Sequence, residues 1–277
     1  MPLTVGIDTR VLKHLDLEHA IREISRHFHI VEICASHIRK LQERHSISEV
    51  YSIVKSICNK YDVSVVQIHA PYGEIDEMWL DDRFTKALEI IKEFIVLCYK
   101  VECPILVMHL PYRRPRYGEL YVELVERQYN ATCRIVKILE PVLREYGVRI
   151  AFENRLEQTF GCTVFDIAEV LYSQGSEMFG ICLDTGHANV NKVDIVDVVR
   201  RLNRLIIATH LHDNDGVQDR HMPPMTGTIP WRDVIRAIVQ YTGAPLVLEV
   251  EPCVPEAGLN VLELCKIVME RLTQEIR

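Results

Sequence analysis

The sequence predicts an α/β protein, a single-domain (β/α)8 TIM barrel that spans residues 1–277. The chain has 277 residues, close to the roughly 250 residues of one such barrel. Eight short runs rich in Val, Ile and Leu alternate with segments of helical periodicity. No linker, low-complexity stretch or second compositional region divides the chain. These observations favour one closed barrel over an open sheet or two domains.

Each expected strand is an apolar run with little alternation between polar and apolar residues. That pattern is typical of parallel strands whose two faces are both buried. In chain order the runs are 4–8, 30–35, 64–70, 105–110, 149–154, 179–184, 205–212 and 245–251.

The segments between the runs carry apolar residues at helical spacing, most clearly in 84–95, 122–143 and 259–269. No G-x-G-x-x-G motif follows the first run, so an open dinucleotide-binding sheet is poorly supported. The stretches 71–81, 111–118 and 212–231 are longer than a barrel needs. Long loops in compact domains are commonly functional.

Composition narrows the class of protein. The formal net charge is −7 with no long basic run, which argues weakly against a nucleic-acid surface. No apolar stretch approaches the roughly 20 residues of a membrane span, and the N-terminus does not have the pattern of a signal peptide. We therefore expect a cytoplasmic protein that does not enter a membrane. The nine cysteines form no C-x-x-C pair, so reduced, mostly buried thiols are expected.

Nine side chains of the types that bind metals lie at or just beyond the ends of the expected strands. They are His69, His109, Glu153, Asp184, His187, His210, Asp219, His221 and Glu249. A parallel barrel gathers the C-terminal ends of its strands at one mouth, where its active site is built. The sequence therefore predicts a cluster of carboxylates and imidazoles at that mouth.

Four of these residues come from consecutive strands, the fifth to the eighth. They are Glu153, Asp184, His210 and Glu249. One strand-end acid often only caps a helix, but four in succession favour a shared divalent cation. Three carboxylates and one imidazole suit Mn²⁺, Co²⁺, Mg²⁺ or Zn²⁺.

The other five residues are predicted to bind substrate or an additional metal. His69 and His109 occupy matching positions on neighbouring strands, although either one alone could be a core histidine. His187 follows Asp184 by three residues and could otherwise start a helix. The last two belong to Asp219-Arg220-His221, which could otherwise be an exposed turn.

Three further features leave alternatives open. Glu153 and Glu249 could act as base and acid at one carbon atom, while a metal polarises a carbonyl group and stabilises an enediolate. Glu32 could point into the mouth or be structural. The basic run 113–117 could be a solvated loop or could bind phosphate.

Several motifs together resemble the xylose isomerase-like TIM barrel superfamily over essentially the whole chain. They are His69-Ala70-Pro71, Phe152-Glu153-Asn154, Leu183-Asp184-Thr185-Gly186-His187, His210-Leu211-His212-Asp213-Asn214-Asp215-Gly216, Asp219-Arg220-His221 and Leu248-Glu249. The resemblance implies one of two branches. One holds sugar and sugar-phosphate isomerases and epimerases. The other holds abasic-site endonucleases related to endonuclease IV (AP endonuclease family 2).

The endonuclease branch holds three zinc ions with nine side chains, and the nine positions above are similar to that pattern. Two features depart from it. The stretch 154–160 is bulky and charged where that branch is small and glycine-rich, and Gly186 stands where that branch usually has Cys.

The isomerase and epimerase branch is similar at Asp184-x-Gly186-His187, at His210-x-x-Asp213 and at Gly227-Thr228-Ile229-Pro230-Trp231. Its members use one metal. The resemblance implies Glu153, Asp184, His210 and Glu249 as its ligands, with His187 near the substrate oxygens.

We therefore predict a divalent-metal-dependent sugar or sugar-phosphate isomerase or epimerase of carbohydrate metabolism. Glu153 and Glu249 are its expected catalytic pair, and its partner is a small-molecule carbohydrate. A dehydratase or lyase is a variant of the same chemistry. The alternative is an endonuclease IV-like zinc phosphodiesterase, the only case with a nucleic-acid partner. A barrel that only binds ligands is a third possibility. Barrels of this size commonly form dimers, so the protein could also be a homo-oligomer.

Overall fold

A computed structural model describes residues 3–156 and 160–275, and its sheet is a parallel barrel. The strands are β1 (Val5–Asp8), β2 (Ile30–Ile33), β3 (Ser64–His69), β4 (Ile105–His109), β5 (Arg149–Glu153), β6 (Phe179–Asp184), β7 (Ile206–His210) and β8 (Leu246–Leu248). Their order is β7-β6-β5-β4-β3-β2-β1-β8. Backbone hydrogen bonds of Leu211 with Val247 and Glu249 join β7 to β8 and close the ring.

The expected (β/α)8 TIM barrel is confirmed, with all eight strands at the expected places. The largest differences are at the ends of β7 and β8, which are shorter than the runs 205–212 and 245–251. Beyond His210 and Leu248 the chain leaves the regular ladder, and Leu211 and Leu248 form only an isolated bridge. Polar side chains at these ends face the mouth instead of continuing the sheet.

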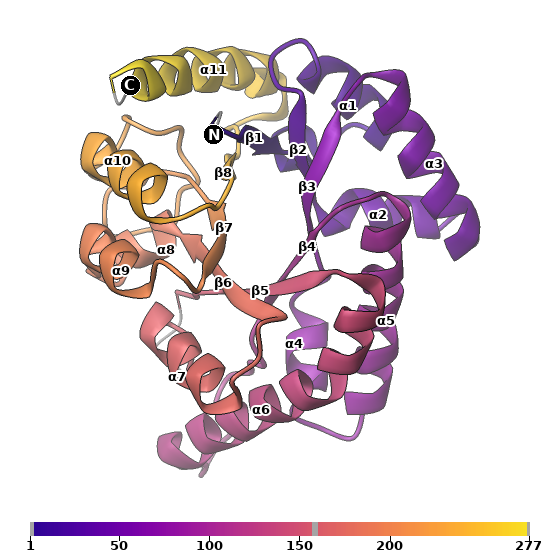
Figure 1. Cartoon of the computed structure of the whole chain (residues 1–277), viewed down its shortest axis with the longest axis vertical. Coiled ribbons are helices and arrows are strands. Elements are labelled where there is room, and N and C mark those ends of the chain that lie inside the picture. The colour runs from indigo at the N-terminus through magenta and orange to yellow at the C-terminus, as the bar shows by residue number, and fades with distance from the viewer. Residues whose placement is uncertain (1–2, 157–159, 276–277) are drawn as a thin grey trace.

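Helices surround the strands on the outside, as Figure 1 shows. They are α1 (Leu17–Ile24), α2 (Ala35–Gln42), α3 (Ile47–Lys60), α4 (Glu74–Met78), α5 (Phe84–Lys100), α6 (Tyr121–Tyr146), α7 (Val164–Gln174), α8 (Thr185–Val190), α9 (Ile195–Leu202), α10 (Trp231–Tyr241) and α11 (Gly258–Gln274). Short 3-10 turns lie at η1 (Thr9–Leu12) and η2 (Pro255–Ala257). Segments 84–95, 122–143 and 259–269 are helical as expected.

The apolar core has two parts. The larger part fills the layer between the sheet and the helices. A smaller group lies inside the barrel and consists of Ile105, Val107, Ala151, Cys182, Ile207 and Ala208. All nine cysteines are free thiols and six of them are buried, as expected. None of the helices described is long and apolar enough to cross a membrane.

The seventh loop is folded into a compact structure above the mouth. The backbones of Asp213 and Met222 pair as an antiparallel bridge. The Asp213 carboxylate accepts hydrogen bonds from the Gly227 amide (2.8 Å) and from the Trp231 indole (2.7 Å). The Gly227-to-Trp231 motif therefore holds this loop in place, which positions Asp219 and His221 over the barrel.

Candidate active site

The nine predicted side chains meet at the C-terminal mouth of the barrel. His69, His109, Glu153, Asp184 and His210 are the last residues of β3 to β7, and Glu249 directly follows β8. His187 lies in the first turn of α8. Asp219 and His221 reach the mouth from the seventh loop. This convergence follows from parallel topology, since strands far apart in sequence end at the same rim.

The first potential metal site contains Glu153, Asp184, His210 and Glu249. Their ligand atoms all lie within 4.8 Å of one another, and the four residues are buried. The Nδ1 atom of His210 is 3.3 Å from Glu153 Oε1, 3.5 Å from Glu249 Oε2 and 4.0 Å from Asp184 Oδ2.

These residues fit a divalent cation. His210 Nε2 donates to the Glu32 carboxylate at 3.0 Å, so Nδ1 is the ring nitrogen that faces the other carboxylates, and it would bind a cation once its proton is displaced. Both His210 Nδ1 and Glu249 Oε2 are buried without a hydrogen-bond partner among the residues described. Zinc-to-ligand bonds of about 2.0–2.2 Å place neighbouring tetrahedral N and O ligands roughly 3.4 Å apart. The observed separations suit that arrangement.

A second potential metal site contains His187, His212, Asp219 and His221. The Nε2 atoms of His187 and His221 lie 3.4 and 3.0 Å from Asp219 Oδ2. His221 has a φ of 44°, in the left-handed region that a side chain such as histidine rarely adopts. Backbone strain of this kind is commonly concentrated at functional sites.

His69 and His109 contact the second carboxylate oxygen of Glu153, Oε2, whereas His210 lies near Oε1. Each places its Nε2 atom 3.2 Å from Glu153 Oε2. The His69 Nδ1 atom donates to the Ala70 carbonyl (2.7 Å), and the His109 Nδ1 atom donates to Asp76 (3.2 Å). Neither histidine is an isolated core residue, because both are aligned on a candidate catalytic carboxylate.

The charges of the mouth are strongly coupled. Burial alone would raise the pKa of Glu153, but His210, His109 and His69 outweigh it and hold that pKa well below the usual range. Burial alone would lower the pKa of His187, yet Asp184, Asp219 and Glu153 raise it to about 10. Carboxylates and imidazoles thus stabilise one another's charged forms across the site.

Sequence reasoning did not place four residues that contact this cluster. Glu32 receives the His210 hydrogen bond, which resolves the open question about its direction: it points inward. Arg10 pairs with Glu249 and with Glu251. Asp76 binds His109 and Arg155. His212 follows His210 by two residues, and this strand-like spacing was the one signal that could have identified it.

Other motif residues have structural roles. The Asn154 side chain bridges β5 and β6 by donating to the Asp184 carbonyl (3.0 Å) and accepting from the Asp184 amide (2.9 Å). In the basic run 113–117, Arg113 is buried and pairs with Glu119. Its guanidinium is therefore committed to an internal ion pair, which argues against a phosphate site at that residue.

A cavity of about 260 Å³ opens beside the first site and has Arg10, Ser36, His69, Tyr72 and Glu249 in its wall. This cavity, which has charged and hydroxyl-bearing side chains in its wall, is a candidate site for the substrate.

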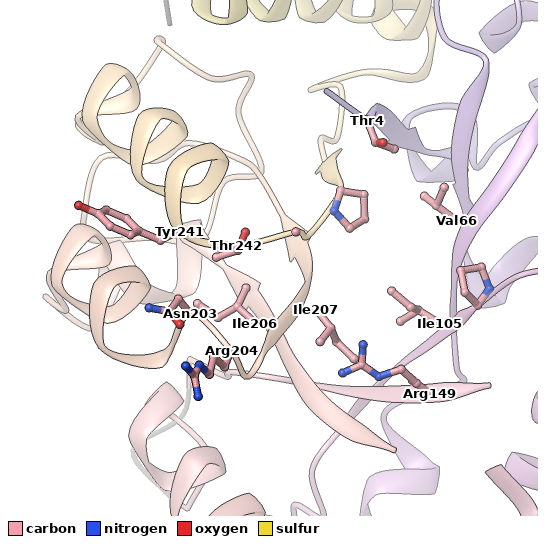
Figure 2. Close-up of a pocket in the computed structure, with 13 residues that line it drawn as sticks. Thr4, Val66, Ile105, Arg149, Asn203, Arg204, Ile206, Ile207, Tyr241 and Thr242 are labelled. Atoms are coloured by element: carbon pink, nitrogen blue, oxygen red, sulfur yellow. The ribbon is translucent and has the colours of Figure 1, made fainter. Parts of the chain in front are cut away.

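A larger cavity of about 510 Å³ lies at the opposite end of the barrel (Figure 2). Its lining includes Ile105 and Arg149, the first residues of β4 and β5. It contains none of the predicted site residues, so its size alone does not make it the active site.

Comparison with known proteins places the chain among similar barrels. A family model described as "Xylose isomerase-like TIM barrel" matches residues 21–265. Uncharacterized protein MJ1311 of Methanocaldococcus jannaschii is 25% identical over 225 residues, which are 79% of this chain and 74% of that protein.

Solved structures are similar over nearly the whole chain. A D-tagatose 3-epimerase-like protein has a TM-score of 0.79 at 21% identity and covers 99% of this chain and 100% of its own. The IolI protein with a bound zinc atom has a TM-score of 0.75 at 16% identity. The match covers 99% of this chain and 98% of the IolI chain. At these identities the likeness to solved structures establishes the fold alone.

Proposed function

Since the chain belongs to the xylose isomerase-like TIM barrel family, as its motifs indicated, we propose that it is a metal-dependent sugar or sugar-phosphate isomerase or epimerase. One observation carries this proposal. The carboxylates of Glu153 and Glu249 both lie close to Nδ1 of His210, at 3.3 and 3.5 Å. Two carboxylates arranged around one cation can serve opposite faces of a bound substrate.

In this proposal Glu153, Asp184, His210 and Glu249 hold the cation. A divalent cation at this position supplies polarisation of a substrate carbonyl and stabilises the negative charge that develops beside it. One glutamate removes the proton from the carbon next to the carbonyl, and the other takes up a proton from solvent and delivers it to the substrate. His187, with His69 and His109, is placed to bind substrate oxygens.

The ionisation of the two glutamates supports their role as proton acceptors. Burial would raise the pKa of Glu249, but His210 and Arg10 hold it far below the usual range. Both carboxyl groups are therefore ionised at neutral pH, as a proton acceptor requires.

The proposed substrate is a ketose or its phosphate. Similar folds include a D-tagatose 3-epimerase-like protein and a D-psicose 3-epimerase crystallised with D-fructose. D-Tagatose, D-psicose and D-fructose therefore form the first panel to test. A dehydratase or lyase that begins with the same proton abstraction falls within the same proposal.

The test is a pair of conservative variants, Glu153→Gln and Glu249→Gln, assayed for metal content and turnover. Loss of a positioned acid or base commonly costs about 10²- to 10⁴-fold in rate. We expect losses of that size in both variants. Glu169→Gln, at an exposed position of α7, is the control and should keep full activity. Unchanged metal binding and turnover in either site variant contradict the proposal.

A zinc phosphodiesterase acting on abasic-site DNA is the second candidate, because the mouth offers more ligands than one cation needs. Two features count against it. Arg155 follows the β5 motif, is buried, and pairs with Asp76 at 2.9 Å, and the formal net charge of the chain is −7. Cleavage of a duplex with one abasic site by zinc-loaded protein would support this candidate, and absence of cleavage would exclude it.

A further inference from the structure

We propose that the cavity at the N-terminal end of the barrel binds a small organic anion through Arg149 (Figure 2). The anion is a carboxylate or a phosphate group carried on an apolar body. This cavity lies at the opposite end from the mouth, and no step of the proposed reaction uses it. The inference therefore does not rest on the proposed reaction.

The first argument is the charge of the cavity wall. Arg149 and Arg204 line the cavity, and none of the described residues that line it is an Asp or a Glu. This excess of positive charge departs from the chain as a whole, whose formal net charge is −7. A cavity lined by charge of one sign concentrates ligands of the opposite sign.

The second argument is that Arg149 has no counter-ion among the described residues. It is the first residue of β5 and is half-buried, and Figure 2 shows its side chain extending toward Ile207 of β7. Within residues 3–156 and 160–275, its buried Nε atom has no hydrogen-bond partner and its guanidinium forms no ion pair.

The surroundings of Arg149 do not compensate its charge. Burial lowers the pKa of Arg149. The acid that opposes this shift, Glu177, is exposed and does not line the cavity. A cation that has lost part of its water without gaining a partner is costly, and a bound anion removes that cost.

The third argument is the chemistry of the wall, which selects the kind of anion. The guanidinium fork of Arg149 matches a carboxylate or a phosphate group with two parallel hydrogen bonds. Ile105 and Ile207 are apolar neighbours of that fork. The side chains of Asn203 and Thr242 donate to carbonyls of α9 and α10. The wall therefore suits an apolar body better than a sugar, which needs many polar partners.

The size of the cavity and its place also support a separate site. Its volume of about 510 Å³ is within the range of small-molecule sites. On β5, Arg149 precedes Glu153 by four residues, which is roughly 13 Å along a strand. Side chains such as Val107, Ala151 and Cys182 fill the barrel between the two ends. A change at one end should therefore leave binding at the other end intact.

Isothermal titration calorimetry of the metal-loaded protein tests the site, with benzoate and phenyl phosphate as probes. We expect saturable binding of at least one probe, with a single molecule per chain. The stronger of the two probes distinguishes a carboxylate from a phosphate ligand. Benzyl alcohol offers the same ring without the charge, and it should bind about 10-fold more weakly or less.

Variants locate the binding. Arg149→Gln should weaken binding of the stronger probe by about 10-fold or more, because the charged fork is lost. Arg149→Lys keeps the charge without the fork and should be intermediate. Arg39→Gln removes the same charge from an exposed position of α2 and should bind like the wild type. Glu249→Gln changes the metal site at the mouth and should also keep the affinity for the probe.

Melting temperatures provide a second measurement and show that each variant is folded. A saturating probe should raise the melting temperature of the wild type, because it binds only the folded state. It should not raise that of Arg149→Gln.

Three results would overturn the proposal. One is the absence of saturable binding of either probe, which would make Arg149 a structural residue of the barrel end. Another is equal affinity in the wild type, Arg149→Gln and Arg149→Lys. The third is loss of binding in Glu249→Gln, which would place the probe at the metal site instead.

Discussion

Glu32 fixes His210, whose Nδ1 atom lies close to both candidate catalytic glutamates. Its carboxylate is fully buried and accepts from His210 Nε2 at 3.0 Å and from Gln67 Nε2 at 2.6 Å. A carboxylate that accepts a hydrogen bond from the other ring nitrogen sets the tautomer of a metal-binding histidine. Removal of such a carboxylate typically weakens metal binding about 10- to 100-fold.

We therefore expect Glu32→Gln to weaken binding at the Glu153–Asp184–His210–Glu249 site by about 10- to 100-fold. The glutamine oxygen can still accept a hydrogen bond, but the negative charge is lost. Titration of the apoprotein against a chelator of known affinity measures the effect. An unchanged metal affinity would mean that Glu32 only fills space.

His37 makes stability depend on pH outside the metal sites. It belongs to α2 and is buried against η1, where Nε2 donates to the Leu15 carbonyl (3.2 Å) and Nδ1 contacts Thr9 (3.1 Å) and Cys34 (3.2 Å). Burial, helped by the charge of Lys40, lowers the pKa of His37 to about 4. The neutral ring is thus part of the folded state.

The sign of the effect follows from proton binding. Below about pH 6.5 the unfolded chain protonates this histidine, whereas the folded chain does so only near pH 4. Stability is therefore lost as the pH falls between these values, by roughly 3 kcal/mol in all.

Urea unfolding of wild type and His37→Gln at pH 7.5 and pH 4.5 measures this contribution. We expect the wild type to lose more stability on acidification than the variant does. The histidines of the mouth titrate in both proteins, so the difference isolates His37. Equal losses in the two proteins would contradict the assignment.

At the scale of elements, the seventh loop depends on one buried carboxylate. Asp213 accepts from the Trp231 indole at 2.7 Å and from the Gly227 amide at 2.8 Å. A hydrogen bond to a charged group contributes about 1.5–3 kcal/mol. Trp231→Phe should therefore destabilise the protein by about that amount beyond the loss of volume.

The chain provides a matched control, because it has only two tryptophans. Trp79 is also buried, but its indole nitrogen has no hydrogen-bond partner among the described residues. Trp79→Phe thus removes similar volume without removing a hydrogen bond. Urea midpoints compare the two variants, and equal destabilisation would show that the Asp213 contact contributes little.

The strand-end residues could be predicted from sequence because each follows an apolar run, and parallel strands end at one rim. Glu153 and Asp184 are examples. Arg10 could not be predicted in this way, since its partner Glu249 is 239 positions away and the contact depends on β1 pairing with β8. Asp76 was missed because it lies in α4, a short helix inside a stretch expected only to be a long loop.

For the seventh loop, the sequence indicated which residues are of the metal-binding type, but it did not indicate which of them turn toward the mouth. Asp219-Arg220-His221 was recognised as a ligand-type run, yet only the folded loop turns Asp219 and His221 inward and leaves Arg220 exposed, paired with Asp215. The positive φ of His221 has no signature in a single sequence. Likewise, the hydrogen bond of His212 Nε2 to Asp184 Oδ2 joins residues 28 positions apart, which a single sequence does not show.

For the whole molecule, barrel closure is what creates the site. β1 pairs with β8, and the backbone of Leu211 joins β7 to β8. The first-site ligands come from the second half of the chain, while Glu32 and Arg10 approach from the first half. Both halves must therefore be closed into one ring before His210 and Glu249 are correctly held.

Two properties of the whole molecule stay predictions from the sequence. They are its assembly into a homo-oligomer and its cytoplasmic location.

The central claim is that Glu153 and Glu249 transfer protons at a carbon atom of a metal-bound ketose. Nuclear magnetic resonance of the ketose panel in D₂O, with metal-loaded protein, tests it most directly. We expect deuterium to enter next to the carbonyl of at least one sugar, and this exchange to disappear in Glu249→Gln. Exchange that is equal in wild type and Glu249→Gln, or cleavage of abasic DNA without any exchange, would contradict the claim.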